Sequence, residues 1–135
     1  GYALRSLGGA LLEQGEYDDA RSAFEQALTI ARAGGNRRAE ASCIAGLGDL
    51  AYRQGRHGDA AALLSEAEAT LRELDDRPLL ADLLCTRGLV DLLRADRAAA
   101  QTALSEAEQV AGTMNAGTAS TLNRVMERLR AAIAE

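Results

Sequence analysis

The chain has 135 residues, a formal net charge of −5 and 15 basic residues, all of which are arginine. A mildly acidic chain of this kind lacks the basic surface that a nucleic-acid-binding domain needs, and it lacks the basic face of a helix that lies on a membrane surface. No apolar run is long enough to span a membrane and no signal peptide is visible, so we expect a cytoplasmic protein. The sequence starts without Met and enters a helical pattern at once, which predicts a segment of a longer protein.

Alanine and leucine dominate the apolar content, whereas the chain has one Phe, three Tyr, no Trp and a single proline, Pro78. Both dominant residues favour helices, and almost no stretch alternates with the period of a strand, so the composition predicts an all-α fold. We expect Cys43 and Cys85, which lie inside helical patterns, to be reduced and to act as small apolar residues.

Small residues recur with a spacing of 40 along the chain. The glycine column is Gly8, Gly48 and Gly88; the two alanine columns are Ala20, Ala60, Ala100 and Ala27, Ala67, Ala107. The string Leu-Ser-Glu-Ala-Glu occurs at 64–68 and again at 104–108 in the same register. The spacing predicts three repeats of two helices each, at about 2–34, 37–74 and 78–112.

The first repeat illustrates the expected hairpin. Its first helix has a buried face that we assign to Leu4, Leu7, Gly8 and Leu11. Gly15 ends this helix, and Asp18 or Asp19 caps the second, which carries Phe24 on its buried face. In the second repeat Leu47 and Leu64 hold the matching positions, Gly55 ends the first helix and Asp59 caps the next.

The third repeat begins after Asp75-Asp76-Arg77-Pro78, where the aspartates suit a cap and Pro78 suits a first helical turn. Leu104 keeps the column of Leu64. Arg87 and Asp91 replace leucines and lie four residues apart, which predicts a partly covered ion pair.

Beyond Gly112, a loop at 113–119 leads to a last helix at about 120–134, whose apolar face would cap the third repeat. The helix at 79–93 is apolar nearly all round; we expect its own neighbours to bury it, with a contact surface as the alternative. We attribute the small columns to close packing, with the alanines at 20, 60 and 100 meeting the glycine notches.

These columns resemble the tetratricopeptide repeat (TPR) family over about residues 2–112. The resemblance rests on Leu7, Gly8, Ala20, Phe24, Ala27, Leu47, Gly48, Ala60, Leu64, Ala67, Gly88, Ala100, Leu104 and Ala107. It implies one α-solenoid domain over 1–135, a right-handed superhelix of three helix-turn-helix repeats with a C-terminal capping helix. The usual period is about 34 residues, and the longer units here resemble the C-terminal TPR sensor regions of bacterial, actinobacterial-type transcriptional regulators.

The resemblance also implies a concave groove lined by the first helices, where a protein or peptide binds. The groove residues would be Tyr2, Arg5, Gly9, Leu12, Ser42, Ala45, Asp49, Tyr52, Asp82, Cys85, Leu89 and Leu92, with Glu13, Arg53 and Thr86 within reach of the same surface. The partner would be a peptide, an amphipathic helix or a neighbouring domain of the same chain. Homodimerisation through exposed repeat faces and small-molecule sensing, or service as an enzyme accessory domain, are the alternatives.

We predict no enzyme activity, no cofactor and no metal. A dinucleotide fingerprint at 46–51 lies within a helical pattern and follows no strand, so we reject it. His57 is the sole histidine and falls at a turn, where we expect a surface residue. A carboxylate clamp is also rejected, because among its expected positions only Arg5 carries a suitable side chain.

Overall fold

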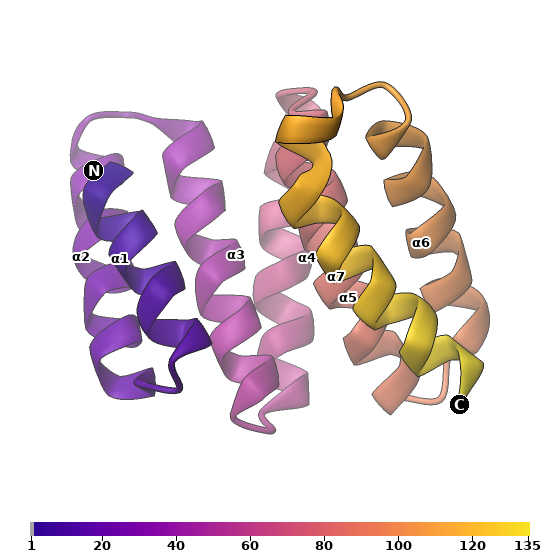
Figure 1. Cartoon of the computed structure of the whole chain (residues 1–135). Coiled ribbons are helices and arrows are strands. Elements are labelled where there is room, and N and C mark those ends of the chain that lie inside the picture. The colour runs from indigo at the N-terminus through magenta and orange to yellow at the C-terminus, as the bar shows by residue number, and fades with distance from the viewer. Residues whose placement is uncertain (1) are drawn as a thin grey trace. The chain divides into compact units, whose positions relative to one another are not determined.

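The computed structural model describes residues 2–135, except for the side chains of Tyr2, Ala116 and Thr118. Within this range the chain is helical and has no strand, which confirms the all-α class. The helices, labelled in Figure 1, are α1 (Tyr2–Glu13), α2 (Tyr17–Ala33), α3 (Arg37–Arg53), α4 (His57–Glu73), α5 (Arg77–Leu93), α6 (Arg97–Ala111) and α7 (Ala116–Ala134). No described helix has both the length and the apolar character that crossing a bilayer requires.

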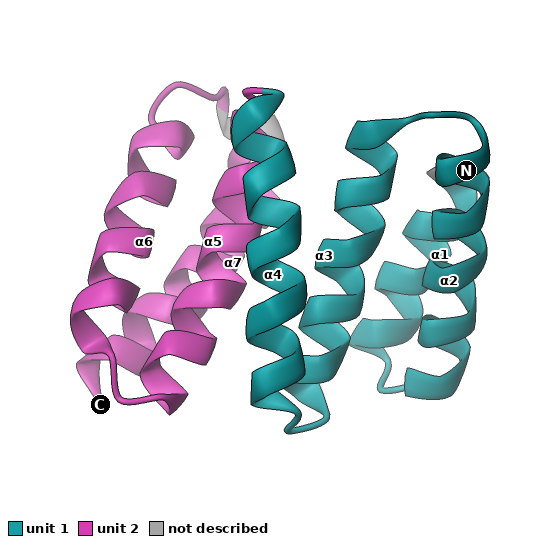
Figure 2. Ribbon diagram, turned by 180° about the vertical axis from the view of Figure 1, so that it is seen from behind, with its two compact units in different colours: residues 1–74 teal, residues 75–135 magenta. Residues whose placement is uncertain are grey.

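The chain divides into two compact units, residues 1–74 and residues 75–135 (Figure 2). Unit 1 holds the hairpins α1–α2 and α3–α4, in which α3 packs against both α2 and α1. Unit 2 holds the hairpin α5–α6, with α7 packed against both of its helices. The hairpins are the units that the 40-residue spacing predicts.

The turns follow a shorter, regular spacing inside this repeat. Helices α2 to α6 begin at residues 17, 37, 57, 77 and 97, so turns within a repeat and between repeats have the same length. The same place in each turn has positive φ, which is 79° at Gly15, 65° at Gly35, 80° at Gly55, 54° at Asp75 and 62° at Ala95. Only glycine adopts this conformation without steric cost, so the last two turns carry local strain.

The helix caps differ in part from the prediction. Asp18, Asp19 and Asp59 lie in the first turns of α2 and α4 rather than at the caps of these helices. In the first turn their negative charges still interact favourably with the positive end of the helix dipole. The capping side chains belong to other helices. Asn36 accepts a bond from Ala39 N at 3.0 Å, Asp76 from Leu79 N at 3.3 Å and Asp96 from Ala99 N at 3.0 Å. Pro78 lies in the first turn of α5, as predicted.

The core of unit 1 is built around the ring of Phe24, which is 5 % exposed. A Cβ atom placed on Gly8 of α1 would lie 2.8 Å from Phe24 Cε1, and one placed on Gly46 of α3 would lie 2.4 Å from the same atom. Glycines from two helices therefore make room for the same edge of the ring. Leu12, Ala20 and Leu50 complete this cluster.

Two assignments on α1 are corrected by this packing. Leu7, predicted to be buried, is 49 % exposed, whereas Leu12, predicted to line a groove, is 3 % exposed. The equivalent of Leu7 one repeat later is Leu47, which packs against the core cluster that includes Phe24 of the preceding hairpin. The described residues place no such hairpin against α1, so Leu7 has no comparable cover.

The glycine column faces large side chains rather than the alanines that we expected to meet it. The atoms nearest to a Cβ on Gly48 belong to Leu64, at 2.9 Å. In unit 2 the nearest atoms to a Cβ on Gly88 belong to Leu129 of α7, also at 2.9 Å, while Leu104 is only partly buried. The alanines of both columns are nevertheless core residues, each at most 1 % exposed.

Helix α7 closes unit 2 with one apolar face, as predicted, but it begins at Ala116 instead of about 120. Leu122, Met126 and Leu129 are buried on this face. Its outer side is tied to α6 by Arg130 and Glu108, whose Nη2 and Oε2 atoms lie 2.8 Å apart. The predicted Arg87–Asp91 pair is confirmed, with 3.5 Å between Nε and Oδ2 and with both side chains about one-fifth exposed, 23 % and 21 %.

Candidate functional site

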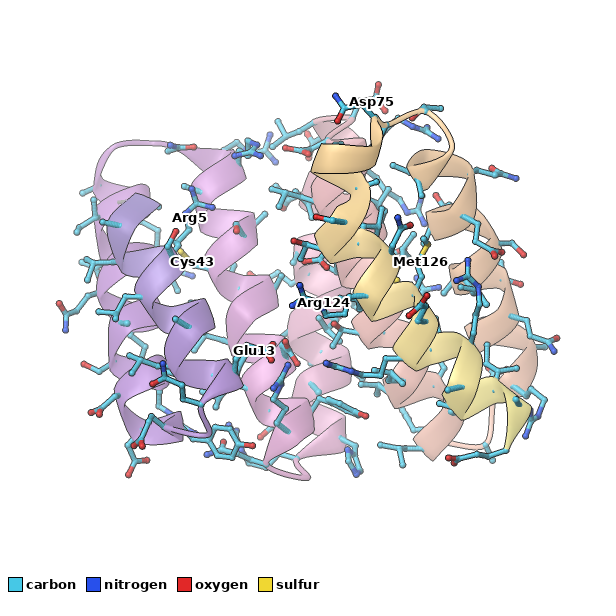
Figure 3. All side chains as sticks on the ribbon, in the orientation of Figure 1. Arg5, Glu13, Cys43, Asp75, Arg124 and Met126 are labelled. Carbon is cyan, nitrogen blue, oxygen red and sulfur yellow. The ribbon has the colours of Figure 1, made fainter. Side chains whose placement is uncertain are left out.

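The side of unit 1 where α1 and α3 meet carries polar side chains that link the two helices. Arg5 on α1 donates from Nη1 to Ser42 Oγ on α3 at 2.9 Å. Figure 3 shows Arg5 next to Cys43, and the two side chains come from adjoining helices. Burial raises the pKa of the Cys43 thiol, although the positive charge of Arg5 acts to lower it. At this end of the α1–α3 face, the guanidinium of Arg5 is therefore fixed by its hydrogen bond to Ser42.

The other end of this face is organised by Arg53. Its Nη2 atom lies 2.8 Å from Glu13 Oε1 on α1, and its Nε atom lies 3.1 Å from Asp49 Oδ1 one turn earlier on α3. The Arg53 side chain is 18 % exposed and the Asp49 side chain 27 % exposed. Partial burial acts to lower the pKa of the Arg53 guanidinium, but the carboxylates of Asp49 and Glu13 raise it overall. These two ion pairs fix the positions of the three charged groups.

Between these two links the α1–α3 face has small residues. A Cβ atom on Gly9 would meet nothing within 4 Å, in contrast to one on the adjacent Gly8. A helical glycine costs about 1 kcal/mol relative to alanine, and no internal contact requires this one. Ala45 lies on the turn of α3 between Ser42 and Asp49, so helical periodicity places it on the same side. The face thus has charged ends and a shallow centre.

The sequence model of the tetratricopeptide repeat family matches residues 2–73, which span α1 to α4. The chain belongs to the tetratricopeptide repeat family. Tetratricopeptide repeats generally mediate protein–protein interactions. A search of the curated proteins found no match. The α1–α3 face just described consists of the first helices of the two tetratricopeptide repeats in unit 1.

The structure separates the predicted groove residues of these repeats into three groups. Arg5, Asp49, Tyr52 and Arg53 are partly exposed on α1 and α3. Leu12, Cys85 and Leu89 are 3 %, 0 % and 7 % exposed, so their assignment to a binding surface is wrong. In unit 2, Asp82 is exposed and Thr86 partly buried on α5. The groove position predicted for Tyr2 lies outside the described side chains.

Leu12 and Leu89 were misassigned because the burial of helical residues depends on which neighbours cover them. Leu12 joins the core cluster with Phe24. Leu89 lies on α5, which packs against both α6 and the closing helix α7. Apolar periodicity in the sequence shows a stripe on a helix, but two adjacent stripes of leucine and alanine look alike. The polar contact between Arg5 and Ser42 was also not predicted, since its partners are 37 residues apart.

The cysteines and the histidine of this tetratricopeptide repeat chain lie in surroundings that can be described one by one. Cys43 and Cys85 are free and 0 % exposed, and burial together with the charge of Asp82 raises the pKa of Cys85 to about 12. A thiol in such surroundings stays protonated and unreactive near neutral pH. The His57 ring lies 6.3 Å from that of Tyr52. Among the described side chains, no group of three or more His, Cys, Asp or Glu could hold a metal ion.

A polar hollow of about 460 Å³ lies at the turn between α1 and α2. Its lining consists of Gly15, Glu16, Tyr17, Asp18, Asp19 and Gln54. Arg21 and Arg56 each donate to Gln54 Oε1, at 3.0 Å and 2.8 Å. The hollow is open to solvent and acidic, unlike the enclosed apolar pocket in which a small molecule is usually held.

Proposed function

We propose that this chain is a protein-binding module and that unit 1 binds its partner on the α1–α3 face. The partner would be an extended peptide, an amphipathic helix or a neighbouring domain of the same parent protein. The observation that carries this proposal is the pair of links across α1 and α3, Arg5 to Ser42 and Arg53 to Glu13. Charged groups that are already fixed lose little conformational freedom on binding, so they favour recognition over simple solvation.

The centre of the face supports the same function. Gly9 has open space where a side chain would be, so the backbone of a bound segment could approach α1 there. Asp49 and Glu13 are acidic groups at the edge of that space and suit a partner with a basic flank. On α5 of unit 2, Asp82 and Thr86 remain predicted contributors of that unit.

A photo-crosslinking residue introduced in place of Gly9 tests this proposal in the native host. The matched control has the same residue in place of Ile30, which is 51 % exposed on α2. We expect a protein adduct from the Gly9 position and none from the Ile30 position. An adduct confined to Ile30, or equal adducts at both positions, would contradict the placement of the binding surface.

Charge reversal provides the second arm of the test. The Glu13→Arg variant would place a positive charge where the basic flank of the partner is expected and should abolish the crosslink at Gly9. Arg32→Glu is the control, because Arg32 is 57 % exposed and contacts Glu40 away from this face. Circular dichroism melting curves of both variants check that a lost crosslink reflects binding and not unfolding.

We further infer that the module is a regulatory or sensory segment of a larger bacterial protein and works in the cytoplasm. The support is the 40-residue period, the exclusive use of arginine over lysine and the resemblance to longer repeats of bacterial regulators. Reduced, buried cysteines agree with this location. The coding sequence around this segment tests the role: an adjoining DNA-binding or ATPase domain would support it, and an adjoining secreted or catalytic domain would contradict it.

A further inference from the structure

The α1–α3 face carries opposite charges toward its two ends. Arg5 is the fourth residue of α1 and Glu13 is its last, and Figure 3 shows these two side chains toward opposite ends of the helix. The hydrogen bond from Arg5 to Ser42 and the ion pair between Glu13 and Arg53 join like ends of α1 and α3, so the two helices run parallel. Their dipoles therefore point in the same direction, with the positive ends on the side of Arg5 and the negative ends on the side of Glu13.

The charges of α1 add to these dipoles instead of opposing them. A helix is stabilised by acidic residues in its first turn and by basic residues in its last turn. Helices α2 and α4 follow this order, with Asp18 and Arg32 on α2 and Asp59 and Arg72 on α4. Helix α1 has no acidic residue in its first turn and no basic residue in its last turn, and it ends on Glu13. Helix stability therefore does not explain the order of charges on α1.

The contacts of these charged groups preserve the same polarity. Burial raises the pKa of the Cys43 thiol, and among the nearby charges that of Arg5 acts against this effect most strongly. Toward the other end, two carboxylates, those of Asp49 and Glu13, share the guanidinium of Arg53. The Glu13 side chain is 64 % exposed, so its carboxylate can contact a partner as well as Arg53.

The separation of the charges sets the length of a segment that could match them. Arg5 and Glu13 are eight residues apart on one helix, which corresponds to about 12 Å along its axis. An extended chain advances about 3.3 Å per residue, so residues four positions apart in a bound segment span about 13 Å. The space beside Gly9 has the depth of one missing side chain. An extended backbone fits this space, whereas a helix about 10 Å wide would stay above it.

We propose that the α1–α3 face binds an extended peptide segment with an acidic residue opposite Arg5 and, four positions away, a basic residue opposite Glu13. This inference rests on the proposed function and adds the charges and the direction of the bound segment. Because charge selects the ends, a segment with its acidic residue first lies parallel to α1, and a segment with its basic residue first lies antiparallel to α1.

Two peptides of the same composition test this direction. The first is acetyl-Gly-Glu-Ala-Gly-Ala-Arg-Gly-Cys-amide and the second has Glu and Arg exchanged; each has a nitroxide spin label on its cysteine, and blocked ends remove the terminal charges. In the first peptide the label is next to Arg, so we expect it to broaden the NMR signals of the Gly15 and Gly55 amides, which follow the ends of α1 and α3. In the second peptide the label is next to Glu, and we expect it to broaden the Ala39 amide in the first turn of α3 instead.

Two variants of the whole chain assign the effect to the negative end of the face. Glu13→Gln removes the exposed carboxylate and should weaken the binding of both peptides about threefold, the size of an exposed ion pair. The matched control is Glu25→Gln, which removes the same charge from an exposed position on α2 and should leave both affinities unchanged.

Three results would overturn the proposed polarity: the same broadening pattern with both peptides, equal broadening toward both ends, or no broadening by either peptide at millimolar concentration. The crosslink from the Gly9 position separates this inference from the proposed function. If that crosslink forms while the peptides show no charge-dependent direction, the binding face stands and only the polarity is wrong. If the crosslink does not form, the proposed binding face itself is wrong.

Discussion

Replacing Gly46 by alanine is the sharpest test of the packing in unit 1. Alanine is a better helix former than glycine by about 1 kcal/mol, so propensity alone predicts stabilisation. The new Cβ atom, however, would lie 2.4 Å from Cε1, 2.6 Å from Cζ and 2.9 Å from Cδ1 of Phe24. Carbon atoms pack at roughly 3.5–4.0 Å, so the ring would have to move by about 1 Å.

Phe24 has little room for that movement. The ring is 5 % exposed, and the same ring atoms also lie against Gly8 of α1, where a Cβ atom would be only 2.8 Å from Cε1. Overpacking of this kind costs about 1–3 kcal/mol. Subtracting the gain in propensity, we expect Gly46→Ala to lower the free energy of unfolding by about 1 kcal/mol.

Gly9→Ala is the matched control, since a Cβ atom there meets nothing within 4 Å. Only propensity acts at this position, and we expect a gain of about 1 kcal/mol. The two Gly→Ala substitutions should therefore differ by about 2 kcal/mol and in sign. Urea titrations followed by circular dichroism at 222 nm measure both values.

A second substitution separates the proposed collision from other effects of Gly46→Ala. Phe24→Leu removes the outer ring atoms and installs the residue that the next repeat has at Leu64. In the double variant the loss from Gly46→Ala should disappear, with a coupling energy of about 1 kcal/mol or more. Stabilisation by Gly46→Ala equal to that by Gly9→Ala, or additive effects in the double variant, would refute the reasoning.

Three further predictions concern other parts of the chain. Ala95→Gly should raise the free energy of unfolding, measured by urea titration, by up to about 1 kcal/mol, because a φ of 62° is strained for alanine. A lower free energy of unfolding would contradict the strain. Cys85, with its pKa raised to about 12 by burial, should not react with a disulfide reagent at pH 8 until the chain is unfolded in guanidinium, and rapid native reaction would refute its burial. Burial raises the pKa of Asp91 despite the opposing charge of Arg87, so the native state binds the proton more tightly than the unfolded chain. The free energy of unfolding should therefore fall as the pH rises from the ordinary pKa of an aspartate through the raised pKa of Asp91. The urea midpoint of the parent chain, relative to that of Asp91→Asn, should fall over the same interval, and a relative rise would contradict this sign.

The sequence alone determined the helical class, the 40-residue repeat and the register of the glycine and alanine columns. It did so because these features are local: helix propensity, spacing and turn residues such as Gly15 and Gly55 act within about twenty residues. The Arg87–Asp91 pair was predictable for the same reason, since its partners lie one helical turn apart.

The proposed binding face depended on contacts between segments distant in the sequence. Arg5 and Ser42, 37 residues apart, form one link, and Arg53 and Glu13, 40 residues apart, form the other. Their residue types suggested a mixed groove, but nothing in the sequence indicated which of the many arginines and acids would pair. Long, flexible charged side chains have many partners within reach, and only the placement of α1 against α3 selects among them.

The burial of individual apolar side chains also depended on the tertiary structure. Leu7 and Leu12 are both leucines of the same helix, yet Leu7 is 49 % exposed and Leu12 is 3 % exposed. Gly46 belonged to a dinucleotide motif that the sequence analysis rejected, and only the structure places it against the ring of Phe24. The physical reason is that a helix specifies the direction of each side chain, whereas the neighbouring helices decide which directions are covered.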